Sequence, residues 1–247
     1  MKPIFGIVGK ELTHSFSPTY FNNKFEASSI NAEYNVFPLD DIADIRNLIA
    51  SNPQIQGLNV TVPYKQSVIP YLNDIDQDAR QIGAVNCIEI RNGQLFGHNT
   101  DHVGFGKTLV KLSSFLNRKV LILGDGGAAQ AVKFSLKTLK ISFTIVSRRA
   151  GNNNITYQQL NENLKEYSII INTTPLGMFP NIDSFPTIPY EYLTPNHCAY
   201  DLIYNPKQTQ FLKLSGLAGA HTINGFDMLI NQADYSWEIW KNNFRNV

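Results

Sequence analysis

Cysteine, long apolar runs and an excess of charge of either sign are all scarce in this sequence of 247 residues. Two cysteines, Cys87 and Cys198, are too few for a disulfide framework or a cysteine-rich zinc site. No apolar run approaches the roughly 18 residues that cross a bilayer. A net charge of +1 gives no general attraction to nucleic acid or to an anionic membrane. The start has only a short apolar stretch before Lys10, so no signal peptide is predicted.

What remains is the composition of an ordinary globular protein, with 43% apolar and 17% charged residues. At roughly 150 residues per domain, the length corresponds to one or two domains. The five histidines lack ligand-like spacing with carboxylates or thiols, so no metal site is predicted. We therefore expect a reduced, cytoplasmic protein that has neither nucleic acid nor a membrane as its partner.

The first hundred residues alternate between β-like runs and helical stretches. Short apolar runs predict strands at Ile4–Val8, Tyr34–Phe37 and Ile55–Val60. Helices are expected at Ser17–Ser28, Asp41–Ile49 and Asp74–Ile82. Ser17 followed by Pro18 suits a serine cap with proline in the first turn. Asn92-Gly93 predicts a hairpin turn between Ala84–Ile90 and Gln94–Gly97.

A second alternating series begins near residue 119, so we expect two α/β units joined near residues 101–118. Its predicted strands are Lys119–Leu123, Ile141–Val146, Ser168–Asn172, Ala199–Ile203 and Ala220–Ile223. Its predicted helices are Ala128–Leu139, which has one apolar stripe, and the long final helix Phe226–Phe244.

A glycine-rich segment lies between the first strand and the first helix of this second series. Gly124-Asp125-Gly126-Gly127-Ala128 and the alanine that follows fit the pattern G-x-G-x-x-A. In such a loop, one glycine permits the tight turn, and the next lets the backbone approach a pyrophosphate at the helix N-terminus. The alternative is an ordinary strand-to-helix turn. The context favours a dinucleotide site.

The end of the next strand indicates which dinucleotide. NAD sites usually carry Asp or Glu there for the ribose 2′-hydroxyl. Here the residues are Ser147, Arg148 and Arg149, with no acid. Guanidinium groups suit a 2′-phosphate, so NADP is predicted. The alternative is a pair of solvated surface arginines.

A third pattern resembles a different nucleotide site. Gly106-Lys107-Thr108 matches the end of a P-loop, but Asp101 stands where the first glycine belongs. The preceding residues are polar rather than a buried strand. A nucleoside-triphosphatase therefore remains only as an alternative from another class.

Polar residues gather at the predicted strand ends of the first half. The segments are His14–Pro18, Asn59–Lys65, Gly83–Asn86 and Gly97–Asp101. In an open parallel sheet, ligands bind outside the carboxyl ends of the strands, so these segments could converge on one polar ligand. Taken singly, each residue also suits a helix cap, a loop or a solvated surface.

Together these segments resemble the shikimate dehydrogenase family. The motifs HSFSP, NVTVPYK, GAVNC, GHNTD, GDGGAA, INTTPLGM, DLIYNP and GFDMLINQA occur in the family's order and approximate spacing. The resemblance runs from the first strand to the last helix. It implies NADPH-dependent reduction of 3-dehydroshikimate to shikimate, in chorismate and aromatic amino-acid biosynthesis.

The resemblance also implies a fold and a set of site residues. The fold is an N-terminal α/β substrate domain, residues 1–101 with 226–247, and a Rossmann-like NADP domain, residues 102–225. The final helix packs back on the first domain. By motif position, Lys65 and Asp101 are the catalytic pair. The substrate ligands are Ser15, Ser17, Thr61, Asn86, Asp101, Tyr204 and Gln232. The cofactor residues are Gly124, Asp125, Gly126, Gly127, Ala128, Ser147, Arg148, Arg149, Leu202 and Gly225.

The sequence departs from the family pattern at two of these segments. Cys87 stands where the family usually has Thr, and a thiol near the cleft would be open to oxidation. Arg149 replaces a hydroxyl residue, which bears on the degree of NADP preference. Two functional alternatives remain open: a quinate/shikimate dehydrogenase that tolerates NAD, and a catalytically silent paralogue that senses nucleotide. A monomer or a homodimer is expected.

Overall fold

The computed structural model describes residues 2–13, 15–116, 118–149, 151 and 154–244. The chain forms two compact units. The first unit comprises Met1–Thr100 with Ala233–Val247, and the second comprises Asp101–Gln232. The division falls inside the last helix, α7 (Phe226–Phe244), which contributes residues to both units.

The first unit is built on a mixed six-stranded sheet. Its strands, in spatial order, are β2 (Glu33–Pro38), β1 (Ile4–Gly9), β3 (Ile55–Val60), β5 (Cys87–Arg91), β6 (Gln94–His98) and β4 (Asp74–Ile75). β1 pairs in parallel with both β2 and β3, whereas β5 is antiparallel to β3 and to β6. Asn92 and Gly93, both at positive φ, form the predicted turn between β5 and β6.

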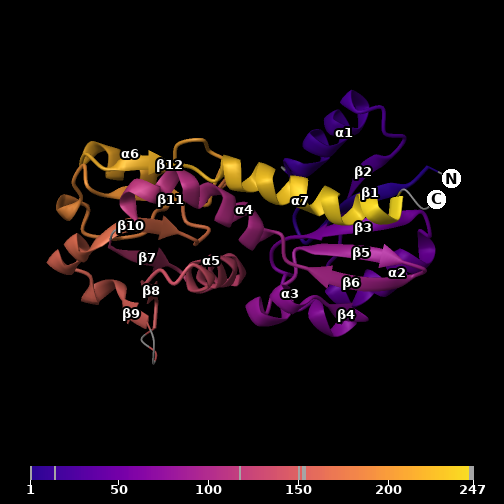
Figure 1. Ribbon diagram of the computed structural model, residues 1–247, viewed down its shortest axis with the longest axis horizontal. Helices are drawn as coiled ribbons and strands as arrows, with labels where there is room; N and C mark the ends of the chain where they lie inside the picture. Colours follow the sequence, from indigo (N-terminus) through magenta and orange to yellow (C-terminus); the bar gives the residue numbers. More distant parts are fainter. Residues whose placement is uncertain (1, 14, 117, 150, 152–153, 245–247) are drawn as a thin grey trace. The chain divides into compact units, whose positions relative to one another are not determined.

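Helices cover both faces of this sheet (Figure 1). On one face, α2 (Ile45–Ser51) and α3 (Gln77–Ile82) pack through Ile45, Ile49 and Ala79 against apolar side chains of β1 and β3. On the other face lie α1 (Ser17–Ala27) and the second half of α7. Short 3₁₀ turns at Ile42–Asp44 and Ile69–Tyr71 complete the unit.

The C-terminal part of α7 is a structural member of the first unit. Trp240 stacks on Phe5 of β1 with ring centroids 5.1 Å apart, and Trp237 meets Phe25 of α1 at 5.1 Å. Ala233 is buried in the same cluster. The expectation that the final helix packs on the first domain is thereby confirmed.

The second unit has a six-stranded sheet in which every pair is parallel. Its spatial order is β12 (His221–Ile223), β11 (Cys198–Asp201), β10 (Tyr167–Asn172), β7 (Lys119–Leu123), β8 (Phe143–Ser147) and β9 (Asn154–Thr156). Numbered from β7, this is the order 3-2-1-4-5-6 of a Rossmann fold. The predicted α/β class with a Rossmann-like domain is confirmed.

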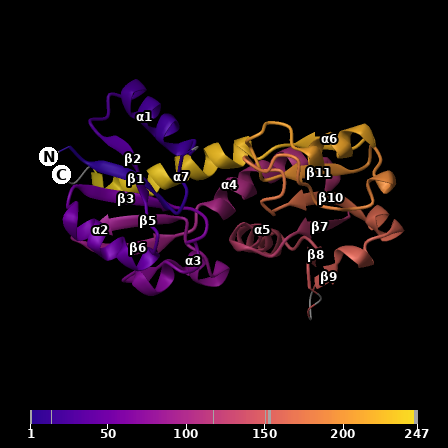
Figure 2. The same cartoon turned by 180° about the vertical axis from the view of Figure 1, so that it is seen from behind.

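Helices lie on both faces of this second sheet as well. One face carries α4 (Asp101–Thr108), α5 (Gly127–Thr138) and the first turns of α7. α4 and α5 lie side by side (Figure 2). The other face carries α6 (Gln210–Leu217) and 3₁₀ turns around Leu160 and Leu164.

Two local predictions are wrong. Ser17 does not cap α1: the helix begins at Ser17 itself, and Phe16 at the N-cap makes no side-chain cap bond. The segment Asp74–Ile82 is not all helix, because Asp74 and Ile75 pair with β6 before Asp76 caps α3. Helix α6 was missing from the predicted elements.

The P-loop-like segment is not a loop. Gly104 to Thr108 belong to α4, and the Thr108 hydroxyl donates to the Phe105 carbonyl at 2.7 Å. A Cβ on Gly104 would lie 2.7 Å from the Met228 carbonyl oxygen of α7. The glycine therefore permits close helix packing, and the triphosphatase alternative loses its structural basis.

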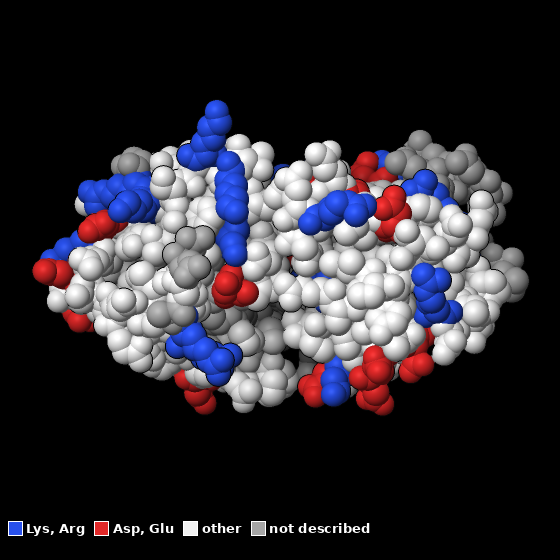
Figure 3. All heavy atoms as spheres, turned by 90° about the horizontal axis from the view of Figure 1, so that it is seen from below, with Lys and Arg blue, Asp and Glu red and all other residues white. Residues whose placement is uncertain are grey.

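Basic and acidic side chains are interspersed on the face shown in Figure 3, in keeping with the net charge of +1. No described helix is both long and apolar enough to cross a bilayer. Within the described ranges, no three His, Cys, Asp or Glu side chains are grouped so that they could hold a metal ion.

His98, at the end of β6, lies between two carboxylates. Its Nδ1 is 2.8 Å from Asp76 Oδ2, and its Nε2 is 3.5 Å from Glu89 Oε2. Burial lowers the pKa of His98, but bonds to Asp76 and Glu89 outweigh it and raise the pKa to about 9. The histidine is therefore protonated at neutral pH, and its charge stabilises the fold.

We expect His98→Gln to lower the free energy of unfolding by roughly 1–3 kcal/mol near pH 7. Because the folded pKa is raised, this contribution is full below about pH 6.5 and is lost as the pH rises through about 9. Urea unfolding at about pH 6 and about pH 10 checks this. His221→Gln, at an exposed position, is the control. A wild-type to variant difference that is the same at both pH values would contradict the prediction.

Candidate active site

Four strand ends of the first unit meet at one edge of its sheet. Because β1, β3 and β6 point the same way and β5 runs opposite, the residues after the first three and before β5 become neighbours. The backbone N–H of Thr61 donates to the Val8 carbonyl at 2.9 Å, and the backbone N–H of Val60 donates to the backbone carbonyl of Asn86 at 2.9 Å. The Asn86 N–H in turn donates to His98 at 3.1 Å. Backbone hydrogen bonds thus join residues of three of the four segments predicted to converge, those that contain Thr61, Asn86 and His98.

Ser15 and Ser17 follow β1 at this edge. Ser15 is half-buried, and Ser17 is 7% exposed at the start of α1. Burial raises the pKa of Tyr34, and a hydrogen bond with Ser17 opposes that rise. His14, the first residue of the HSFSP segment, lies outside the described residues. The Ser17 hydroxyl is thus directed to a distant tyrosine rather than to its own helix.

Lys65 is held beside Asn86 through the backbone. A turn after β3, closed by the Tyr64 N–H bonding to the Thr61 carbonyl at 2.9 Å, leads to Lys65. The Lys65 carbonyl then accepts from the Val85 N–H at 2.7 Å. The lysine is half-buried.

The other predicted substrate residues belong to the second unit. Asp101 follows Thr100 directly, begins α4 and is 6% exposed. Gln232 of α7 approaches α4 at Gly104, where a Cβ would lie 2.9 Å from the glutamine Cβ. Tyr204 is half-buried on the loop after β11. Ser15, Ser17, Thr61, Lys65 and Asn86 are therefore placed by one unit, and Asp101, Tyr204 and Gln232 by the other.

The glycine-rich loop has the geometry of a phosphate cradle. Gly124 follows β7 at φ +102, and a Cβ there would lie 2.9 Å from the Thr173 hydroxyl. Gly126 has no atom within 4 Å of its Cβ position, so its backbone is open to an approaching group. Gly127 and Ala128 begin α5, whose N-terminal N–H groups favour an anion.

The loop also carries a carboxylate that the sequence pattern does not explain. The Lys133 ammonium group, on α5, donates to Asp125 Oδ1 at 2.9 Å, and Gln130 Nε2 donates to the same oxygen at 3.1 Å. The lysine offsets a negative charge beside the phosphate cradle. Lys133 was not among the predicted residues, although its spacing from Asp125 along the first turns of the helix could have indicated it.

The two arginines lie just past β8. Arg148 and Arg149 are exposed, and no described carboxylate oxygen lies within 4 Å of their guanidinium nitrogens. Asn154 Nδ2 donates to Ser147 Oγ at 2.5 Å and to the Arg149 carbonyl at 3.3 Å, closing the turn. The turn thus presents two unneutralised guanidinium groups beside the phosphate cradle, which suits an additional phosphate.

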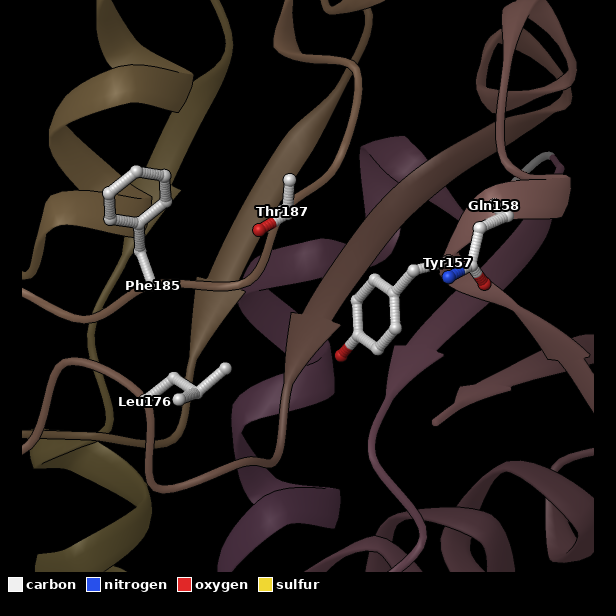
Figure 4. Close-up of a pocket in the computed structure, with 5 residues that line it drawn as sticks. All are labelled: Tyr157, Gln158, Leu176, Phe185 and Thr187. Atoms are coloured by element: carbon white, nitrogen blue, oxygen red, sulfur yellow. The ribbon is translucent and has the colours of Figure 1, made fainter. Parts of the chain in front are cut away.

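A hollow in the second unit lies near these arginines. Leu176, Phe185 and Thr187 line it from the segment after β10, and Tyr157 and Gln158 line it from the segment after β9 (Figure 4). The Tyr157 ring projects toward the segment that carries Leu176 and Thr187. Burial raises the pKa of Tyr157, and the nearby Arg148 opposes that rise, so the hollow and Arg148 are neighbours.

The two residues predicted to pass near the nicotinamide are in contact with each other. A Cβ on Gly225 would lie 2.0 Å from the Leu202 carbonyl oxygen, so no side chain fits there. The Gly225 N–H donates to the Ile203 carbonyl at 3.1 Å. Leu202 itself is tied to β10 through its N–H and the Asn172 carbonyl, at 3.0 Å.

A buried carboxyl that the sequence analysis missed holds the loops after β10 and β11. Asp201 accepts from the Asn172 amide at 3.0 Å, the Ile203 N–H at 3.0 Å and the Thr209 hydroxyl at 2.6 Å. Burial raises the pKa of Asp201 to about 6, and these three bonds oppose the rise. The loop that carries Leu202 and Tyr204 is thereby anchored at its start.

Comparison with known proteins identifies this arrangement. The shikimate dehydrogenase substrate binding domain family matches residues 7–88. A shikimate dehydrogenase (NADP(+)) of Methanococcus maripaludis is 38% identical over 255 residues, which covers 96% of this chain and 91% of the relative. The chain belongs to the shikimate dehydrogenase family.

Two solved structures show how far the family fold extends. Shikimate 5-dehydrogenase of Thermus thermophilus, in complex with NADP(H) and shikimate, has a TM-score of 0.86 at 26% identity and covers 97% of this chain and 94% of its own. A ligand-free 5-ketofructose reductase of Gluconobacter has a TM-score of 0.82 at 30% identity, with 97% and 93% covered. The same architecture therefore serves more than one named activity.

The cysteine that departs from the shikimate dehydrogenase pattern is fully buried. Cys87 has no exposed surface, and burial raises the pKa of its thiol. A thiol that is both neutral and inaccessible does not react readily. The expectation of an oxidation-sensitive thiol at the cleft is wrong for this reason.

We expect Gly126→Ala to separate cofactor binding from folding. Its φ of −87 suits alanine and its surroundings are open, so the melting temperature should change little. The added methyl group stands where a pyrophosphate would approach, so the KM for NADP should rise roughly tenfold or more. Calorimetry and steady-state kinetics measure the two effects. Gly216→Ala, in α6, is the control, and an unchanged KM for NADP in Gly126→Ala would disprove the cradle assignment.

Proposed function

We propose that this protein reduces 3-dehydroshikimate to shikimate with NADPH, the reversible step of chorismate and aromatic amino-acid biosynthesis. The observation that carries the proposal is that one chain contains both a polar sheet edge in its first unit and a Rossmann unit that has arginines after β8. Lys65, Thr61 and Asn86 lie together at that edge. The relatives named NADP-dependent shikimate dehydrogenases cover nearly the whole chain.

The residues present fit NADP. The open backbone at Gly126 and the N-terminus of α5 would hold the pyrophosphate, and Ser147, Arg148 and Arg149 would meet the 2′-phosphate. The hollow beside Tyr157 offers room for the adenosine end. Leu202 and Gly225 would lie against the nicotinamide. When bound, the cofactor supplies the hydride.

The chain's own residues position the substrate and manage one proton. Ser15 and Ser17 would hold the substrate carboxylate, with Tyr204 on the same side. Thr61, Asn86 and Gln232 would bind ring hydroxyls. Lys65 would give a proton to the carbonyl oxygen as it becomes a hydroxyl, and Asp101 would orient Lys65 and bind a hydroxyl.

Lys65 provides the first test. Lys65→Met keeps the length of the side chain but removes the proton, so kcat with shikimate and NADP should fall roughly 100- to 10,000-fold with KM far less affected. Steady-state rates of NADPH formation measure this. Lys213→Met, on an exposed position of α6, is the control. A change confined to KM would mean that Lys65 only binds substrate.

The cofactor preference provides the second test. Arg148→Ala should raise the KM for NADP roughly 10- to 150-fold, because a charge-assisted bond to the 2′-phosphate is lost. The KM for NAD should barely change. Arg46→Ala, an exposed arginine of α2, is the control. Equal losses with both cofactors would overturn the 2′-phosphate assignment.

The substrate itself is tested with purified protein and either NADP or NAD. We expect turnover with shikimate and NADP to exceed turnover with quinate or with NAD. Reduction of 5-ketofructose with NADPH is measured alongside. Higher turnover of quinate or 5-ketofructose would reassign the substrate. No turnover of any substrate by protein that binds NADPH would favour a sensing role. The proposal places the enzyme in the cytoplasm, as a monomer or homodimer.

A further inference from the structure

A chain of buried polar side chains runs through the first unit behind the polar sheet edge. The Tyr34 hydroxyl donates to Asn59 Oδ1 at 2.8 Å, and Asn59 Nδ2 donates to the Ser236 hydroxyl at 3.0 Å. The Ser236 and Thr100 hydroxyls are 3.2 Å apart. Each of these four side chains is at most 5% exposed. The chain thus links β2, β3 and α7 to the segment after β6.

This series of hydrogen-bonded side chains ends at Asn86 and fixes the plane of the Asn86 side-chain amide. Asn86 Nδ2 donates to the Thr100 hydroxyl at 2.9 Å, and the Thr100 backbone N–H donates to Asn86 Oδ1 at 2.6 Å. The two bonds are reciprocal, so exchanging the amide oxygen and nitrogen would bring donor against donor at the Thr100 N–H. Thr100 therefore determines which atoms of the carboxamide point in each direction.

Ser236 is the junction of this chain. Besides Asn59 and Thr100, it forms a hydrogen bond with the Cys87 thiol, and it has no exposed surface. Its place is set by Trp240 one turn later in α7, because residues four apart share a helix face. The Trp240 indole N–H donates to the Ile88 carbonyl at 3.0 Å. A shift of α7 would therefore move the Ser236 hydroxyl away from Thr100.

We propose that Thr100 and Ser236 are positioning residues for substrate binding, acting through the carboxamide of Asn86. The inference rests on the proposed role of Asn86 as a ligand of the shikimate ring hydroxyls. A hydroxyl on the substrate can be matched only if the donor and acceptor atoms of the amide are presented in a fixed order. Thr100 sets that order directly, and Ser236 holds Thr100 from the helix side.

If Thr100 and Ser236 had only a structural role, their substitution would give a different result from the one that positioning predicts. If the two hydroxyls only satisfied buried polar groups, their removal would lower stability and leave substrate binding untouched. Positioning predicts an effect on the KM for shikimate that is absent from the KM for NADP. It also predicts that the effect disappears once Asn86 is removed, because interacting residues are not additive.

The test uses Thr100→Val, Thr100→Ser and Ser236→Ala in the full chain. Thr100→Val should raise the KM for shikimate about 5- to 20-fold and leave the KM for NADP within about twofold, whereas Thr100→Ser, which keeps the hydroxyl, should restore it. Ser236→Ala, one bond further away, should give a smaller rise. Thr108→Val is the matched control, since Thr108 is a buried threonine that bonds to Phe105 and Tyr200 in the second unit.

A double-mutant cycle then identifies the route of the effect. In an Asn86→Ala background, neither Thr100→Val nor Ser236→Ala should raise the KM for shikimate further. Additive effects, or equal changes in both KM values, would overturn the proposal.

A readout without activity separates this proposal from the proposed function. The side-chain amide protons of Asn86, observed by NMR, should exchange slowly with water in the wild type and clearly faster in Thr100→Val and Ser236→Ala. If the wild type does not turn over shikimate, the proposed function fails, and the exchange rates still decide whether Thr100 and Ser236 hold Asn86. Unchanged exchange in both variants would refute the positioning role.

Discussion

The close contact of Trp240 with Gly57 sets the geometry of the first unit. A Cβ on Gly57 would lie 2.4 Å from the indole nitrogen, so only glycine lets α7 pack this closely against β3. The indole N–H then bonds to Ile88 on β5, a residue 152 positions earlier in the chain. A helix from the end of the sequence is thereby registered against the two central strands. The polar edge of the sheet depends on that register, because Ser236 reaches Thr100 only from there.

In the second unit the buried carboxyl group of Asp201 has a role comparable to that of the Trp240 indole, because its hydrogen bonds constrain the loops around it. Asp201 takes three donors at the end of β11, and Asn172, one strand away, takes the Thr174 N–H and hydroxyl at 3.0 and 2.6 Å. A buried carboxyl is costly unless its oxygens are satisfied. The loops on either side must therefore keep their paths. The loop after β10 begins beside the point where the strand order reverses, between β7 and β10, which is where a Rossmann sheet binds its cofactor.

The sequence predicted elements best where the signal was local. β3 and β7 have the predicted bounds, because each is a short segment with apolar residues that is followed by a polar or glycine residue. The prediction failed where a residue distant in the sequence determines the local structure. Ser17 has the residue type of a helix cap, but its hydroxyl turns to Tyr34. Asp74 and Ile75 continue a helical pattern, but the open edge of β6 captures them as a strand.

The residues of the candidate site also fall into those that a sequence pattern indicates and those that it does not. Lys65, Asn86 and the glycine loop stand in motifs whose spacing could be recognised before any contact was known. Ser236 could not be recognised, because the sequence pattern of an amphipathic helix does not distinguish a buried serine from a solvent-exposed one. Only its burial against Asn59, Thr100 and Cys87 reveals it. Since each buried hydroxyl in that chain must find a partner, a change at one position is constrained by the others. The residues that orient the site are thus coupled by packing rather than by any pattern along the chain.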